Sequence, residues 1–404
     1  MRVFHGWWIV ATCLICSLVG NAFGLFGAGV YLHEVVTANG WTTGLVSGAV
    51  TLFYVVSALL LIPVGGAIRN YGPRPVIALG GIALAGGVVG IGHAGAPWQV
   101  YLAFLLMGIG WAGLSTTAVA TTLAPWFDKH QGRAVSIASL GASAGGMIGA
   151  PALLFGIARI GFAATTIVAA VAAIAVVIPL AALVLRHRPQ DMGLVPDGLP
   201  SGSVAATNDS PDWTRMAALR TPALGSVMTA FGIGMMAQIG FLTHQVALLA
   251  QSVDALAVSM TVSSTAVSAL VGRLALARFA DEMDPKVTTA VALLTAAGSL
   301  GVIGLFPVPV VLIGASIVFG LTVGNVTTLA PIIVRREFGA RAFGLVFGVA
   351  SCGIQLAAAV GPSFYGLLHD SFGSYSPALI GAAGLDIAAA AIVMAGHRKP
   401  AELS

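Results

Sequence analysis

Long, uninterrupted apolar runs constrain the fold of this chain more than any other feature of its sequence. Each run holds about 20 or more residues, the length that an α-helix needs to cross the ~30 Å hydrocarbon core of a bilayer. Charged residues make up only 8% of the chain, whereas soluble domains carry roughly 25%. Because so few charges cannot cover the surface of a water-soluble fold, the chain is predicted to be an integral membrane protein in contact with the lipid bilayer.

The apolar runs predict helices and not the strands of a membrane barrel. Strands in such barrels alternate apolar and polar residues, while these runs are apolar throughout. We therefore predict an all-α integral membrane fold of twelve transmembrane helices, with boundaries near residues 7–32, 44–68, 75–95, 98–125, 132–158, 162–186, 221–250, 254–279, 287–306, 308–334, 341–368 and 376–396.

One long polar stretch, rich in Pro, Gly, Ser and Asp, separates six of these runs from the other six. Such a composition is typical of a linker. The predicted organisation is an N-terminal six-helix half, a cytoplasmic linker and a C-terminal six-helix half, at residues 1–186, 187–219 and 220–404.

Basic residues gather on one side of this topology. With the N-terminus inside, sixteen of the eighteen lysines and arginines fall in inner segments, and only Arg159 falls near an outer loop. This bias predicts a multi-pass protein of the cell (inner) membrane with both termini in the cytoplasm. The net charge of +4 follows from the same bias, so nucleic-acid binding is not expected.

Several short patterns resemble chemical motifs, but their context argues against that reading. Cys13-x-x-Cys16 has redox or metal spacing but lies in an apolar run without a second ligand pair, so no metal or cofactor is expected. Gly108-x-Gly110-x-x-Gly113 has dinucleotide-binding spacing without a preceding strand. No Walker loop or nucleophile elbow occurs in the sequence, so the chain is not expected to be an enzyme.

Small residues in the fifth run predict close helix packing. Gly141, Gly145 and Gly149 recur at intervals of four residues and would lie on one helix face. Small residues at this spacing let helix backbones approach each other within a membrane.

The two halves resemble each other in sequence. Pro73-Arg74 matches Pro285-Lys286, and Arg133-Ala134 at the start of the fifth run matches Arg341-Ala342 at the start of the eleventh. Parallel repeats of six helices are the plan of the major facilitator fold.

Short motifs over most of the chain carry a family resemblance. They are His5-Gly6-Trp7-Trp8, Trp126-Phe127 with Gly132-Arg133-Ala134 and Pro151, Gly272-Arg273-Leu274 with Ala280-Asp281 and Asp284-Pro285, and Gly361-Pro362 with Asp370 and Gly373-Ser374-Tyr375. The chain thereby resembles the major facilitator superfamily, and within it the monocarboxylate porter family and its bacterial relatives. The resemblance implies a transporter with a substrate-related arginine at Arg273.

Two features depart from that family's pattern. The loop after the second helix usually carries Asp-Arg, where this chain has Arg69-Asn70. The proton relay of the animal members uses a lysine in the first helix and an aspartate in the eighth near their arginine. The first helix of this chain has no lysine, and the eighth has no acidic residue near its centre. Proton coupling by that route is therefore not expected.

Arg273 is the sharpest candidate for substrate binding, because it lies within a predicted transmembrane helix. Arginine in a span costs roughly 2.5–3.5 kcal/mol on insertion scales, so such residues usually face the bundle interior and have a function. A guanidinium group matches a carboxylate in bidentate geometry. The alternative is that Arg273 reaches the inner membrane interface beside Arg278.

Other polar residues in the spans are further candidates. Substrate contacts are predicted for His244, Asn325, Ser115, Ser143 and Gln355, and helix packing is the alternative role for each. Thr116 and Thr117 resemble Ser115 in this respect. Histidine titrates near neutral pH and buried acids are expensive, so the proton-coupling candidates are His244, Glu34 and Asp386.

These observations predict a monomeric secondary active transporter that moves a small monocarboxylate by alternating access, with proton symport left open. Arg273 is the one basic residue well inside a span, which favours a single carboxylate. Hydroxyl groups and helix ends offer an alternative site for a second carboxylate. The rival functions are an oxalate/formate-type anion exchanger, an exporter of another small organic compound, a solute-sensing receptor and a membrane enzyme.

Overall fold

The computed structural model describes residues 4–127, 130–196, 215–279 and 283–395. Within these ranges the chain is helical and contains no strand, and twelve helical segments are long and apolar enough to cross a membrane. This confirms the predicted all-α membrane fold and its span count. The chain divides into two compact units, residues 1–205 and 206–404, with six of the spans in each. Ala280 and Asp281, and residues 197–214 of the predicted linker, lie outside the described residues.

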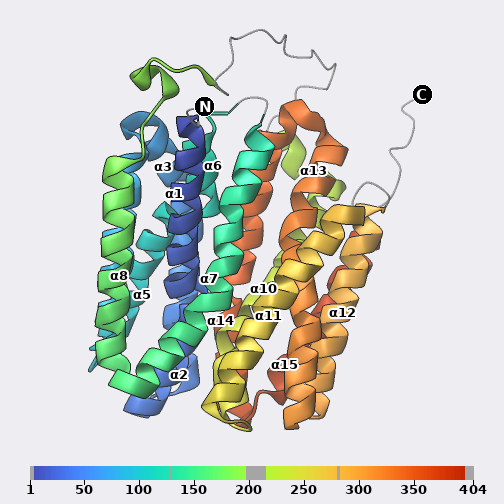
Figure 1. Ribbon diagram of the computed structural model, residues 1–404. Helices are drawn as coiled ribbons and strands as arrows, with labels where there is room; N and C mark the ends of the chain where they lie inside the picture. The colour runs from blue at the N-terminus through green and yellow to red at the C-terminus, as the bar shows by residue number, and fades with distance from the viewer. Residues whose placement is uncertain (1–3, 128–129, 197–214, 280–282, 396–404) are drawn as a thin grey trace, which may run out of the picture. The chain divides into compact units, whose positions relative to one another are not determined.

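Unit 1 contains the first six spans, two of which are interrupted (Figure 1). Its helices are α1 His5–Gly20, the π-helix η1 Asn21–Leu25, α2 Gly27–Asn39, α3 Thr43–Tyr71, α4 Pro73–Gly92, α5 Pro97–Gly113, α6 Thr116–Leu123, α7 Gln131–Ile160, α8 Phe162–Leu183 and the short 3-10 helix η2 Pro189–Met192.

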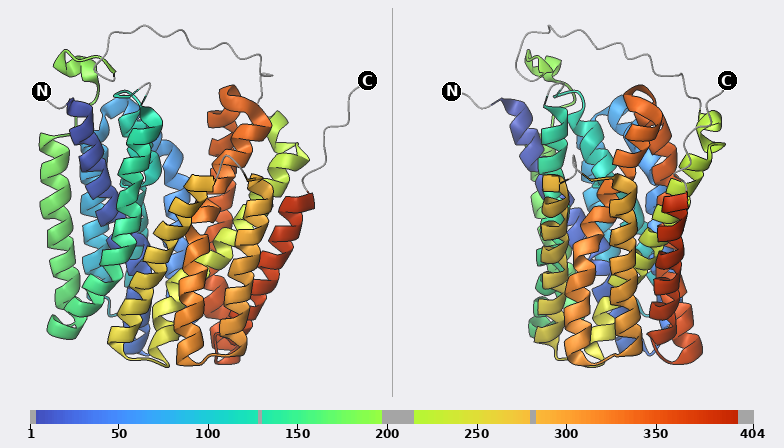
Figure 2. Two further views of the ribbon diagram at one scale, coloured as in Figure 1. Left: turned by 45° about the vertical axis from the view of Figure 1, so that its right-hand side comes forward. Right: turned by 90° about the vertical axis from the view of Figure 1, so that its right-hand side faces the viewer.

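Glycines set the close approach of α7 to α1 in unit 1, and Figures 1 and 2 show the two helices side by side. A Cβ atom on Gly141 would collide with the backbone of Leu14, and one on Gly145 would lie 2.6 Å from the Leu18 carbonyl oxygen. A Cβ on Gly149 would lie 2.5 Å from Cα of Ala22. The packing role predicted for this glycine row is confirmed.

Unit 2 contains the other six spans. Its helices are α9 Arg215–Leu219, α10 Pro222–Ala250, α11 Ala255–Phe279, α12 Pro285–Leu305, α13 Pro309–Ala359, α14 Gly361–Phe372 and α15 Ser376–Ala395. Helix α10 packs against α13, α14 and α15, and α12 runs alongside α15, as both views of Figure 2 show.

Helix α13 corrects the predicted boundary between the tenth and eleventh spans. A break was expected between residues 334 and 341, but one helix of 51 residues runs from Pro309 to Ala359. A straight helix of that length would be about 76 Å long, far more than one membrane crossing. The ribbon of α13 reverses direction in Figure 1. The tenth and eleventh spans are therefore Pro309–Phe338 and Val346–Phe372. A helix break follows within the eleventh span, at Val360, because Pro362 in the first turn of α14 has no N–H group.

Candidate functional site

Arg273 lies on α11 within a span and is half-buried against α13. A Cβ atom on Gly324 of α13 would lie 3.0 Å from Cβ of Arg273 and 3.2 Å from its Nε. It would also lie 2.6 Å from the carbonyl oxygen of Ala269, one helical turn before Arg273. The absence of a side chain at Gly324 therefore makes the room that the arginine stem occupies.

The same helix pair contains two more close glycine contacts. A Cβ on Gly320 would lie 2.5 Å from the Thr265 carbonyl oxygen, and one on Gly272 would collide with the backbone of Leu321. These glycines and Gly324 hold α11 and α13 together with little space between them. We call this contact the glycine seam. It fixes the position of Arg273 inside the helix packing of unit 2.

Asn325 directly follows Gly324 on α13. Its Nδ2 donates a hydrogen bond to the Leu321 carbonyl at 3.2 Å. Its Oδ1 is buried and has no hydrogen-bond partner among the described residues. A buried amide oxygen without a donor is costly, which marks this position as one that a donor-bearing ligand or water would satisfy. Gln355 is half-buried on the second part of the same helix.

His244 lies on α10 with 1% of its surface exposed, and both of its ring nitrogens have partners. Nε2 lies 3.0 Å from the Pro362 carbonyl oxygen, and Nδ1 lies 3.2 Å from the Tyr375 hydroxyl. The ring also stacks on Tyr365, with centroids 5.8 Å apart and planes 14° apart. His244 is thus held by α14 and by the turn before α15.

Asp386 lies on α15 and is 1% exposed. Its Oδ1 has no hydrogen-bond partner among the described residues, and neither has the hydroxyl of Tyr365 on α14. Asp386 acts electrostatically on that tyrosine. An unpaired acid at such a position is energetically unfavourable.

Unit 1 contains an irregular region that the sequence analysis did not predict. Span four breaks between α5 and α6, where Ser115 is extended and caps α6: its Oγ accepts from the Ala118 N–H at 3.3 Å and donates to the Ala112 carbonyl at 2.8 Å. Ser115 itself is buried. Thr116 and Thr117, the first two residues of α6, are exposed. The serine was a usable signal, since serine is a favoured N-cap.

The break in span four lies against the π-helix of span one. A Cβ on Gly20 would lie 2.9 Å from Cβ of Leu114, and one on Gly24 would lie 2.7 Å from Cδ1 of Trp111. The π-helix is closed by a bond from the Phe26 N–H to the Asn21 carbonyl at 3.0 Å. Such π-bulges and broken membrane helices are frequent at functional sites.

The two remaining predicted residues lie elsewhere in unit 1. Ser143 is half-buried on α7, and Glu34 is half-buried on α2. Ser143 precedes Gly145 of the glycine row that packs on α1.

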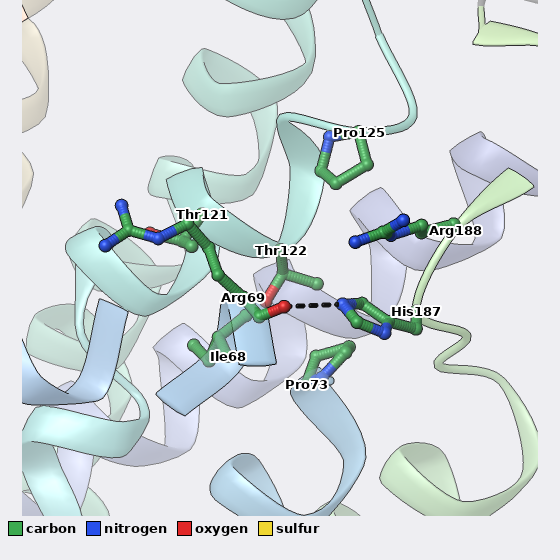
Figure 3. Close-up of a pocket in the computed structure, with 8 residues that line it drawn as sticks. All are labelled: Ile68, Arg69, Pro73, Thr121, Thr122, Pro125, His187 and Arg188. Atoms are coloured by element: carbon green, nitrogen blue, oxygen red, sulfur yellow. Dashed lines mark hydrogen bonds between the residues drawn. The ribbon is translucent and has the colours of Figure 1, made fainter. Parts of the chain in front are cut away.

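A pocket lies at one end of unit 1, where hydrogen bonds hold neighbouring segments of the chain together (Figure 3). It is lined by Ile68, Arg69, Pro73, Thr121, Thr122, Pro125, His187 and Arg188. Figure 3 shows the side chains of Arg69 and Arg188 on opposite sides, so the two guanidinium groups do not converge on one ligand. Instead, Nε2 of His187 donates to the Arg69 carbonyl at 3.1 Å, and Nε of Arg74 donates to the Leu185 carbonyl. These bonds tie the segment after α8 to the α3–α4 turn.

Relatives of known sequence point to one class of protein. The chain is 24% identical to monocarboxylate transporter 13 of Bos taurus over 397 residues, covering 96% of this chain and 88% of that protein. It is 28% identical to monocarboxylate transporter 11 of Mus musculus over 342 residues, covering 79% and 71%. It is also 29% identical, over 95% of its length and 89% of the relative, to an uncharacterized 38 kDa protein of Thermoproteus tenax.

Solved structures share the fold. A bacterial homologue of the human lysosomal transporter Spinster, inward-facing and unoccupied, superposes with a TM-score of 0.71 at 15% identity and covers 99% of this chain and 100% of its own. A variant of the nucleoside transporter NupG superposes with a TM-score of 0.74 at 12% identity, covering 96% and 100%.

Twelve apolar helices in two units of six define a multi-pass membrane transporter with the major facilitator fold. The sequence profile of the Major Facilitator Superfamily matches residues 14–309, and the chain belongs to that superfamily.

Proposed function

We propose that this transporter carries small monocarboxylates and that Arg273 binds their carboxylate group. The observation that supports this most directly is the position of Arg273 in a span, beside the glycine seam. A guanidinium group recognises a carboxylate through two parallel hydrogen bonds. Relatives over most of the chain are named monocarboxylate transporters, which supports the same substrate class.

The proposed transport cycle is alternating access, as in other transporters built from two helical repeats. Substrate binding neutralises the charge of Arg273 within the membrane, and this lowers the cost of enclosing the site. Ser115, Ser143 and Gln355 stay in the proposal as further polar contacts. We propose a monomer in the cell membrane with both termini cytoplasmic, without enzymatic activity.

Proton symport belongs to the same proposal. His244, Glu34 and Asp386 are carried forward as the residues that bind the coupled proton. His244 ranks first, because its Nδ1 is hydrogen-bonded to the hydroxyl of Tyr375, which lies at the α14–α15 turn. A titratable side chain with a hydrogen-bonded route for its proton is better suited to coupling than an isolated one.

A second candidate function is anion exchange with a dicarboxylate of the oxalate type. It is favoured by the break in span four, where the start of α6 exposes Thr116 and Thr117. The first N–H groups of a helix have no partners within the helix and attract anions. We propose that one carboxylate of such a substrate binds at the start of α6.

Counterflow in proteoliposomes tests both candidates. Proteoliposomes that contain the purified protein are loaded with one unlabelled acid. Uptake of radiolabelled lactate, pyruvate or oxalate is then measured with and without a pH gradient. We expect lactate or pyruvate to exchange, and Arg273→Lys to lower this exchange by about tenfold or more because the bidentate pair is lost. The matched control is Arg335→Lys at an exposed position of unit 2. Exchange of oxalate alone favours the second candidate, and no response to any acid rejects the substrate class.

A further inference from the structure

Polar side chains lead from the α14–α15 turn into the interior of unit 2. His369 and Asp370 begin this row, with Nδ1 and Oδ1 3.6 Å apart and side chains 22% and 28% exposed. The ring of His369 lies 4.3 Å from that of Tyr375 between centroids. Tyr375 is 4% exposed and contacts His244, which is 1% exposed. The partly exposed pair of His369 and Asp370 therefore lies next to Tyr375, and Tyr375 contacts the fully buried His244.

The hydrogen-bond partners fix the tautomer of His244. The carbonyl oxygen of Pro362 only accepts hydrogen bonds, so Nε2 of His244 carries the hydrogen and donates it. Nδ1 then presents a lone pair, and the Tyr375 hydroxyl donates to it across 3.2 Å. Burial, with a further contribution from Asp370, raises the pKa of the Tyr375 hydroxyl, so the phenol keeps its hydrogen at neutral pH. The bond therefore has one direction, from Tyr375 to His244.

Titratable groups near His244 come from two neighbouring helices. His369 and Asp370 of α14 act electrostatically on its ring. From α15, the buried Asp386 acts on Tyr365, the ring stacked on His244. The α14–α15 turn therefore places titratable side chains close to His244.

We propose that Tyr375 delivers protons from the His369–Asp370 pair to His244, and that His244 is the proton-binding site of this transporter. This inference rests on the proposed carboxylate transport. In the transfer step the O–H bond of Tyr375 breaks and an N–H bond forms at Nδ1 of His244. The phenol oxygen regains a hydrogen from the proton held by the His369–Asp370 pair. The net change is one imidazole converted to imidazolium and one proton lost from the pair.

The resulting charge explains how the proton and the substrate are linked. Protonated His244 adds a positive charge to the spans of unit 2, in addition to that of Arg273. A charge at such depth is expensive unless it is balanced. One carboxylate that enters with one proton adds no net charge to these spans, so each ligand favours the binding of the other.

Two matched tyrosine variants test the proposal. Tyr375→Phe removes the hydroxyl that contacts His244 and keeps the aromatic ring. Tyr365→Phe is the control, because its ring also lies against His244 but its hydroxyl has no partner among the described residues. Each variant is reconstituted, and labelled lactate and pyruvate are followed in two modes: uptake driven by an inward proton gradient, and counterflow at equal pH. Counterflow also reports whether the variant is folded.

We expect Tyr375→Phe to slow gradient-driven uptake by about tenfold or more, the scale of a lost proton-transfer group, while counterflow stays near wild type. Tyr365→Phe should resemble wild type in both modes. Gradient-driven uptake by Tyr375→Phe at the wild-type rate would overturn the proposal, as would a parallel fall of both modes, which indicates a structural role. If the wild-type protein shows counterflow but a proton gradient does not accelerate its uptake, the proton relay is rejected and the carboxylate proposal stands. Absent wild-type counterflow rejects the carboxylate proposal together with it.

Discussion

Nε of Arg273 lies 3.2 Å from the point that a Cβ atom on Gly324 would occupy, so the position of the guanidinium depends on a glycine of another helix. Since α11 and α13 meet along the glycine seam, the arginine has little freedom to move aside. This relationship links the proposed carboxylate-binding arginine to helix packing. It also predicts that substitutions of two glycines of α13, Gly324 and Gly314, affect transport differently.

Gly324→Ala should impair transport, because the added methyl group displaces the arginine stem or separates the two helices. Overpacking of this kind costs about 1–3 kcal/mol, so we expect counterflow to fall about tenfold. Gly314→Ala is the matched control, since a Cβ on Gly314 meets nothing within 4 Å. Equal transport by the two alanine variants would show that the position of Arg273 is not set by Gly324.

Ser115→Ala should destabilise unit 1, because the buried serine makes both hydrogen bonds at the break in span four. Loss of an N-cap costs about 1 kcal/mol, and the melting temperature in detergent should fall by a few degrees. Ser115→Thr keeps the hydroxyl and should restore both stability and counterflow. If alanine is tolerated in both assays, the break is held by its packing on the π-helix and not by the serine cap.

The fold was largely predictable from the sequence, because hydrophobic length decides a membrane span by itself. The predicted helix boundaries differ most from the structure where a helix continues between two spans or breaks within one. The gap predicted between the tenth and eleventh spans is helical, because α13 continues through it, although the two spans are distinct. Conversely, Ser115 interrupts a run whose hydropathy is continuous.

The candidate sites were predictable residue by residue but not as groups. Arg273 stands out because a charge in an apolar run is rare. Its dependence on Gly324 requires the register of α11 against α13, which no local pattern encodes. The partners of His244 likewise come from residues more than a hundred positions later, Pro362 and Tyr375. Sequence periodicity identifies a helix face but not the residue opposite it.

The ion pair at the α12 N-terminus offers a third test. Nζ of Lys286 lies 2.6 Å from Oε1 of Glu337, joining the first turn of α12 to α13. Its counterpart in the sequence repeat, Arg74, ties the α3–α4 turn of unit 1 to Leu185. We expect Glu337→Lys to lower the melting temperature of the protein in detergent, because it places two like charges together. A partly exposed pair contributes up to about 1 kcal/mol. The double variant Lys286→Glu with Glu337→Lys should recover the loss, and no recovery would show that the pairing is not the cause.

The three proton-coupling candidates differ in their hydrogen bonding, and this predicts different responses to substitution. His244→Gln removes the titratable group, so we expect uptake driven by a proton gradient to fall about tenfold or more while counterflow continues. Asp386→Asn should keep gradient-driven uptake, because Asp386 on α15 is not part of the row of side chains that ends at His244. Glu34→Gln should also keep it, since Glu34 lies on α2 in unit 1 and is not part of the row that ends at His244.

The measurement is the initial rate of labelled lactate or pyruvate uptake at several external pH values, with counterflow as the control for folding. Asp254→Asn serves as a further control, since asparagine keeps the N-cap that Oδ1 of Asp254 provides to the Ala257 N–H at the start of α11. A flat pH profile in His244→Gln, with the wild-type profile in the two acid variants, supports His244 as the proton site. A flat profile in Asp386→Asn, with the wild-type profile in His244→Gln, would move the site to α15 and would require a proton route that bypasses Tyr375.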